Sequence, residues 1–158
     1  MSKVSYQAQL TVVAGEPDII RSTVIQSFSV TGGSSSKPID LKSANDTGIL
    51  AALEQARAKK NITLFKRPSK DDLDSVLIDM FQKKTVFGMN FEVYASYTGT
   101  GIQIVHFFGE DATISSQPTR VGGKQDLLLK VEISFPKADF KHAAKQNGKW
   151  VDDGDWIR

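Results

Sequence analysis

Cysteine is absent from all 158 residues of the sequence. Its absence excludes disulfide bonds, thiolate metal sites and catalysis by a cysteine nucleophile. A chain without cysteine fits synthesis in a reducing cytoplasm, although many secreted proteins also lack this residue.

Long apolar segments are absent as well. The first seven residues, Met1 to Gln7, do not contain the apolar core of a signal peptide. No apolar run in the chain is long enough to cross a bilayer. We therefore expect no cleaved leader and no membrane insertion.

A strong net charge is also missing. Lysine and arginine total 20 against 18 aspartate and glutamate residues, which gives a net charge of +2. This balance argues against a strongly cationic nucleic-acid binder but leaves room for a local basic patch. Hydrophobic residues make up 40% of the chain, enough for a core of its own. The length suits one domain, or one domain with an arm, and we assign residues 1–141 to the domain and 142–158 to a C-terminal arm.

Common catalytic and phosphate-binding motifs do not occur in the sequence. The two histidines, His106 and His142, lack metal-ligand spacing, and there is no H-E-x-x-H, G-x-S-x-G, P-loop or G-x-G-x-x-G pattern. Asp152, Asp153 and Asp155 lack the alternating ligands and the distal glutamate of a calcium loop. We predict no catalytic, metal-binding or cofactor-binding residue and no enzyme activity. We expect His106 to lie in the core or on a sheet face.

Alternating apolar and polar residues dominate the stretch from Thr85 to Phe135. The first run places Phe87, Met89, Phe91, Val93 and Ala95 on one face, and the last does the same with Leu127, Leu129, Val131, Ile133 and Phe135. Period-2 alternation is typical of strands with one buried face. Between these runs we expect a strand at 102–108, a bend at 109–111 and a short strand at 112–116.

A long N-terminal hairpin is predicted by the same kind of pattern. Apolar residues alternate with polar ones from Val4 to Val12, and Gly15-Glu16-Pro17-Asp18 is a strong turn signal. The second strand runs from about Ile19 to Thr31. We expect Val24, Phe28 and Val30 to share its apolar face.

Two helices are expected between the hairpin and the central strands. The first runs from about Thr47 to Lys59, after several possible capping residues, and Asn61 can end it. A short strand follows at 62–66, and Ser69 and Asp72 then stand in capping-box spacing before the second helix. The apolar stripes are Ile49, Leu50, Leu53 and Ala56 in the first helix and Leu73, Val76, Leu77, Met80 and Phe81 in the second.

The regular pattern ends after Pro136. The residues from Lys137 to Lys149 are polar and basic, with a helix-compatible turn at 140–145, and the last nine residues hold both tryptophans and three aspartates. Taken together, the elements predict a mainly β fold of the α+β type. We expect an antiparallel β-sandwich or barrel with one or two short flanking helices.

One segment of the sequence, together with the order of the elements, supports a resemblance to a known family. The segment Phe108 to Pro118, with its Gly109-Glu110-Asp111 bend, leads through Gly122-Gly123 into the alternating strand that ends at Phe135. This segment and the order of the elements resemble bacteriophage tail tube proteins, a group that also includes the tubes of contractile injection machines. The resemblance covers residues 62–141 and, more loosely, the N-terminal hairpin. The second helix and the C-terminus rich in tryptophan and aspartate depart from the simplest subunit of this kind.

The resemblance implies a β-sandwich-like barrel that assembles with copies of itself into six-fold rings. These rings would stack into a tube for genome passage in a virion tail, after assembly in the host cytoplasm, with tail sheath, baseplate and tape-measure proteins as partners and no cofactor. Joining sheet edges around a ring removes the open edges that long hairpins leave. The residues expected at contacts between subunits or stacked rings are Gly32, Gly33, Ser34, Ser35, Ser36, Lys37, Pro38, Trp150 and Trp156.

Other interpretations stay open. A tube initiator of the baseplate or a tail terminator ring would use the same fold. A nucleic-acid-binding β-barrel would use the basic 59–70 region around Phe65, which could equally be a solvated edge between two helices. The segment from Gly32 to Pro38 is either a flexible surface loop or one that orders against a neighbouring subunit.

Overall fold

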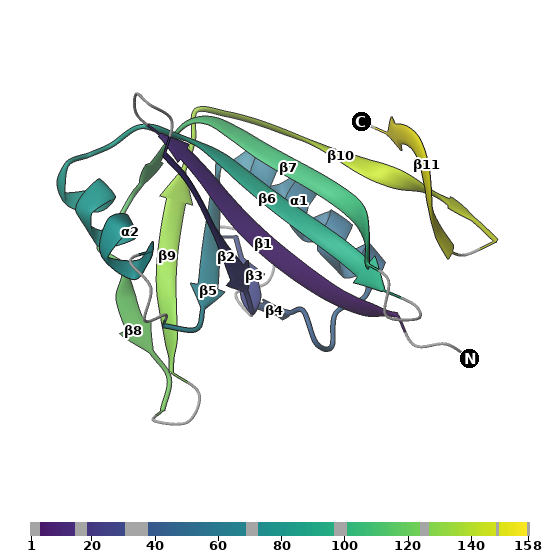
Figure 1. The fold of residues 1–158 in the computed structure, drawn as a ribbon, viewed down its shortest axis with the longest axis horizontal. Coiled ribbons are helices and arrows are strands. Elements are labelled where there is room, and N and C mark those ends of the chain that lie inside the picture. The colour runs from purple at the N-terminus through teal and green to yellow at the C-terminus, as the bar shows by residue number, and fades with distance from the viewer. Residues whose placement is uncertain are drawn as a thin grey trace.

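The computed structural model describes residues 4–14, 19–30, 38–68, 73–96, 101–123, 127–147 and 149–157. Within them the chain forms mostly antiparallel strands, together with two helices, as the sequence predicts (Figure 1). The strands are β1 (Ser5–Ala14), β2 (Ile19–Ile25), β3 (Ser27–Ser29), β4 (Ile39–Asp40), β5 (Asn61–Lys66), β6 (Phe87–Ser96), β7 (Gly101–Ile114), β8 (Thr119–Val121), β9 (Leu128–Ser134), β10 (Lys137–Gln146) and β11 (Lys149–Ile157). The helices are α1 (Asp46–Lys59) and α2 (Leu73–Gln82).

The strands form two layers that share one strand. Sheet A runs in the order β2-β1-β6-β7-β10, and β11 extends it from β10. Sheet B contains β4, β3, β5, β9 and β8. The end of β7 pairs with β9 of sheet B, so the continuous backbone of β7 connects the two sheets covalently. Figure 1 shows α2 at one end of the long axis and the β10–β11 hairpin at the other.

The alternating runs form the strands that the sequence predicts, and their apolar residues fill the space between the layers. Leu10 lies opposite Phe91 in the β1–β6 ladder, and the side chains of both are almost fully buried. Phe28 of sheet B packs edge-on against Phe91 with ring centroids 5.2 Å apart. The predicted N-terminal hairpin is confirmed by the pairing of β1 with β2.

The second arm of this hairpin differs from the prediction at its centre. The chain bends at Gln26, where it passes from β2 in sheet A to β3 in sheet B. The bend reverses which residues face the core, so Ile25 is buried while Val24 is 60% exposed. The prediction that Val24 shares the apolar face of Phe28 is therefore wrong.

Helix α1 begins and ends through identifiable caps. The Asn45 side chain accepts a hydrogen bond from the Gly48 backbone N–H at 2.7 Å, and Ile49, Leu53 and Ala56 are buried. The last helical residue is Lys59, and the C-cap residue is Lys60, which takes the left-handed conformation with φ 61°. The sequence suggested Asn61 as the residue that ends the helix. Asn61 already belongs to β5, which explains the earlier end.

Strand β7 is one continuous strand of 14 residues rather than the two short strands predicted. The predicted bend is present as an irregularity in pairing. Phe87 lies opposite Ala112 and Met89 opposite Gly109, so Glu110 and Asp111 bulge from the ladder. Asp111 has φ 53°, a left-handed conformation that is uncommon outside glycine and is tolerated best by aspartate and asparagine.

The C-terminal region departs most from the sequence prediction. The helix-compatible turn expected at 140–145 is wrong, because these residues lie within β10, which pairs with β7. Phe140 lies opposite Phe107, and the two rings stack with centroids 6.2 Å apart. Burial of Phe140 against the core outweighs the helical propensity of the alanines and lysines around it.

Candidate assembly surfaces

Strand β2 forms an open edge of sheet A. Among the described residues it pairs with β1 alone, so its outer backbone groups have no strand beside them. Val24, at 60% exposure, lies on this strand. An exposed edge strand with an apolar side chain is a template for pairing with another chain.

The face of sheet A that points away from the core is polar. One cross-strand row runs from Gln9 through Glu92 and His106 to Lys141. His106 Nε2 lies 2.8 Å from Asn90 Oδ1. Of the two positions predicted for His106, the core or a sheet face, the structure shows the sheet face, since its neighbours in the chain, Val105 and Phe107, are buried in the core.

A tyrosine and a glutamate are joined on the same polar face. The Tyr94 hydroxyl donates to Glu92 Oε2 at 2.9 Å. Burial raises the pKa of the Tyr94 phenol, and the hydrogen bond to Glu92 and the charge of that carboxylate raise the pKa further. The phenol therefore stays protonated over the physiological range, and its hydroxyl donates to Glu92.

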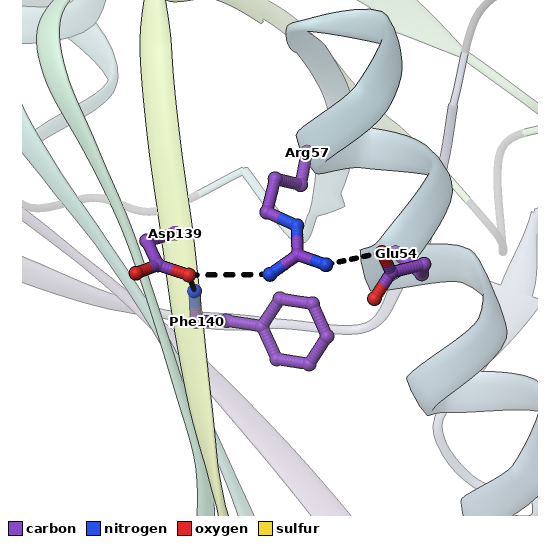
Figure 2. Close-up of polar contacts among 4 residues, drawn as sticks. All are labelled: Glu54, Arg57, Asp139 and Phe140. Atoms are coloured by element: carbon purple, nitrogen blue, oxygen red, sulfur yellow. Dashed lines mark hydrogen bonds and ion pairs between the residues drawn. The ribbon is translucent and has the colours of Figure 1, made fainter. Parts of the chain in front are cut away.

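Arg57 ties helix α1 to the start of the C-terminal hairpin. Its guanidinium pairs with Glu54 on the same helix and with Asp139 Oδ1 on β10 at 3.2 Å (Figure 2). The guanidinium carbon also lies 5.0 Å from the centre of the Phe140 ring, a cation–π contact. Asp139 Oδ1 accepts a second hydrogen bond from the Phe140 backbone N–H. The hydrogen bond to Glu54 is the main reason that the pKa of Arg57 is raised.

The structure places the two predicted interface tryptophans on one hairpin strand. Trp150 is 4% exposed, belongs to the hydrophobic core and packs edge-on against His142 with ring centroids 6.4 Å apart. Trp156 lies on β11 opposite Ala143. Trp150 therefore anchors the hairpin within its own subunit, and the assembly role expected for both residues stays a prediction.

The predicted stacking loop falls almost wholly outside the described residues. This applies to Gly32, Gly33, Ser34, Ser35, Ser36 and Lys37. Pro38, the last residue of that segment, is described and exposed, directly before β4. The buried Val30 marks the other side of the loop, at the end of β3.

Within residues 59–68, the described part of the basic region, the accessible surface is not continuous. Lys66 is 1% exposed, and its ammonium group pairs with Asp74 on α2. Phe65 is 9% exposed, so its ring is not available for stacking with a base. Lys59, Lys60 and Arg67 are exposed.

In the part of the chain that the structure describes, no group of three histidine, aspartate or glutamate side chains could hold a metal ion. Within the same residues, no helix has the length and apolar character required to span a membrane.

The contacts of Arg57 and Lys66 could not be found from the sequence. Arg57 and Asp139 are 82 positions apart, so no local spacing connects them. Lys66 follows four consecutive buried residues of β5, and an apolar run that ends in lysine ordinarily places that lysine in solvent. Its partner Asp74 could be read only as a favourable charge in the first turn of α2.

Comparison with known proteins identifies the fold. No known protein family and no curated protein matches the sequence. Among solved structures, a crystal structure of an Hcp protein aligns with a TM-score of 0.59 at 12% identity, over 87% of this chain and 92% of that one. Hcp1 from Salmonella typhimurium gives 0.57 at 11% identity, over 89% and 87% of the two chains.

A chain of the six-fold symmetrised baseplate of the anti-feeding prophage aligns as well. It has a TM-score of 0.50 at 8% identity, over 89% of this chain and 95% of that one. Likeness at these identities is likeness of fold. The chain therefore has the fold of Hcp proteins and of a prophage baseplate component, which confirms at the level of the fold its resemblance to the tail tube group and the tubes of contractile injection machines.

Proposed function

We propose that the chain is a structural subunit of a phage tail tube. Six copies form a ring, and the rings stack into a conduit for genome delivery. The fold shared with Hcp proteins and a baseplate component supports this role. The role is architectural, so it requires contacts between copies rather than a reacting group.

The open edge of sheet A is the observation that carries the proposal. The sheet ends in β2 on one side and in the β10–β11 hairpin on the other. An edge strand left in water invites uncontrolled pairing, and closure of a ring removes such edges as closure of a barrel does. A ring in which β2 of one copy meets the opposite side of sheet A in the next copy would give a continuous wall.

The polar face of sheet A suits the inner wall of such a conduit. Its central row combines Glu92 and Lys141 with the neutral side chain of Gln9 and with His106. A wall of mixed charge binds phosphate weakly, and weak binding allows DNA to move along the tube.

The remaining partners follow from the same role. Residues 142–158 act as an arm, and the loop from Gly32 to Pro38 contacts the next ring. Tail sheath, baseplate and tape-measure proteins bind the assembled tube in the virion tail after assembly in the host cytoplasm. The nucleic-acid-binding alternative has less support, because burial of Phe65 and Lys66 removes the centre of its proposed surface.

Negative-stain electron microscopy of the concentrated full-length protein tests the proposal. We expect six-fold rings and stacked tubes. Substitution Val24→Lys should prevent ring closure and leave a folded monomer, because the side chain is 60% exposed in the subunit and a charge blocks edge pairing. Ala51→Lys, on the exposed face of α1, is the matched control and should assemble normally.

Two outcomes would reject or narrow the proposal. Monomers at every concentration, together with salt-sensitive binding to single-stranded DNA, would reject the tube role in favour of the nucleic-acid-binding alternative. Deletion of residues 32–38 should spare folding and rings but impair stacking, and normal polymerisation of that variant would remove the loop from the assembly.

A further inference from the structure

An open groove lies where β1 ends, β6 begins and β7 bulges. Its volume is about 520 Å³, and its lining includes Val13, Val86, Gly88, Glu110 and Asp111. The groove is on the α2 side of the subunit, because β6 begins shortly after that helix ends (Figure 1).

The floor of the groove is apolar and accessible. Val86 is 54% exposed, and Val13 and Ala14 are half-buried beside it. A Cβ built on Gly88 would approach only the Val13 carbonyl oxygen, at 3.8 Å. A second chain could therefore lie close to the backbone here without displacing a side chain.

The wall of the groove is acidic. Glu110 and Asp111 form the bulge of β7, and both side chains are exposed. Within the described residues, neither carboxylate takes part in an ion pair, although Lys137 stands opposite Glu110 in the β7–β10 ladder.

We propose that this groove receives the segment Gly32 to Pro38 of a second copy in the next ring. The inference rests on the stacked rings of the proposed function and names the surface that the loop contacts. Glycine and serine make up the first five residues of the segment, and such small residues can enter a shallow groove. Lys37 is the only charged residue of the segment, and it complements Glu110 and Asp111. Pro38 provides an apolar ring for the floor.

The course of β2 separates the groove from the two ends of the same subunit's loop. Ile19 pairs with Ala14 beside the groove, and β2 then runs away from it to Ile25, a distance of about 20 Å for seven residues. The described residues that flank the segment are Val30, after β3, and Pro38, before β4, and both follow β2 in the chain beyond its end far from the groove. The donor and acceptor surfaces therefore lie apart on one subunit, as a head-to-tail contact between stacked copies requires.

Cross-linking between two cysteine variants tests the contact directly. Because the chain has no cysteine, the full-length variants Lys37→Cys and Val86→Cys each carry a single thiol. When the two proteins are mixed, assembled and mildly oxidised, we expect disulfide-linked dimers that neither variant forms alone. Lys37→Cys mixed with Ala51→Cys is the control, because Ala51 is exposed on α1 and outside the groove.

The charge contribution is tested by a double-mutant cycle on tube formation. Asp111→Asn removes the carboxylate and keeps a residue that tolerates the left-handed backbone. Asp111→Asn and Lys37→Ala should each raise the protein concentration needed for tubes severalfold, with rings unchanged, and the double variant should be no worse than either single one. Arg120→Glu, on exposed β8, is the charge control and should assemble as the wild type does.

The outcomes separate this inference from the tube role itself. Tubes that form without a specific cross-link in the mixture, and whose assembly is unchanged by Asp111→Asn, would overturn the groove contact and leave the tube role standing. Absence of rings and tubes from the wild-type protein would overturn both.

Discussion

Lys66 ends β5 with its ammonium group inside the protein. The side chain is 1% exposed, and Nζ pairs with the carboxylate of Asp74, which is 18% exposed, in the first turn of α2. Nζ also donates to the backbone carbonyl of Arg67 at 2.9 Å. The pair thus links β5 to α2 across the connection between them.

Substitution Asp74→Ala should destabilise the subunit strongly. Removal of one partner of a buried ion pair costs about 3–5 kcal/mol, because the other charge stays buried with less compensation. The Arg67 carbonyl still accepts from Lys66 in the variant, so we expect the lower end, about 3 kcal/mol. For a chain of this length that loss lowers the melting temperature by about 6–12 °C.

A double-mutant cycle separates the ion pair from other effects of the substitution. Lys66→Met removes the buried charge and keeps a long apolar side chain, so the further cost of Asp74→Ala in that background should fall below about 1 kcal/mol. Asp79→Ala on the same helix is the control. Its partner Lys83 is 71% exposed, and an exposed pair contributes less than about 1 kcal/mol.

The measurement is urea unfolding followed by far-ultraviolet circular dichroism, at concentrations too low for assembly. Similar slopes for all variants would show that the transition midpoints can be compared. A loss below about 1 kcal/mol for Asp74→Ala, or full additivity in the cycle, would refute the argument that Lys66 depends on this carboxylate.

Three further predictions concern other contacts. Arg57→Lys keeps the charge but loses the planar fork and the stacking on Phe140, so amide exchange in β10 and β11 should accelerate with little change in the unfolding midpoint. Gly109→Ala places a Cβ 3.1 Å from the Phe135 ring and should cost about 1–3 kcal/mol in urea unfolding, whereas Gly88→Ala should be close to neutral. The raised pKa of Tyr94 contributes stability below about pH 10 that is lost as pH rises through the folded-state pKa. Ultraviolet titration should show that Tyr94→Phe removes a phenol whose pKa is above about 10. Removal of a phenol that ionises at about pH 10 would contradict the upward direction of the pKa shift.

The sequence predicts the strands whose pattern is set by one buried face. In β6, residues alternate between the core and the polar face over the whole strand, so periodicity alone identifies both its type and its inner side. The same holds for β1 and β9. The type and the buried face of such strands can be predicted without knowing which strands pair with them.

Strands that change sheet or lie at an edge are not predicted in this way. The bend at Gln26 reverses the faces of β2 and β3, and the sequence around it contains neither glycine nor proline to mark the change. The start of β10 is a strand because Phe140 finds Phe107 across the ladder, a contact between residues far apart in the chain. Where tertiary contacts decide the structure, local propensity is a poor guide.

Some candidate surfaces also follow from the local sequence pattern, whereas others depend on strand pairing. The polar face follows from the alternating pattern, since a strand with one buried face leaves the other for solvent. The open edge depends on which strands pair with β2. The groove depends on the bulge at Glu110 and Asp111, whose outward direction is fixed by pairing with β6. The sequence predicted a bend at these residues but did not predict the groove that they line.

Strand β7 provides a path for mechanical load between the two sheets. One backbone belongs to sheet A along most of its length and to sheet B at its end. In the proposed ring, tension applied to sheet A by a neighbouring subunit would therefore pass into sheet B along covalent bonds. Layers held only by side-chain packing would instead slide under such shear. The bulge at Asp111 lies just before the residues at which the strand passes from one layer to the other, Thr113 and Ile114.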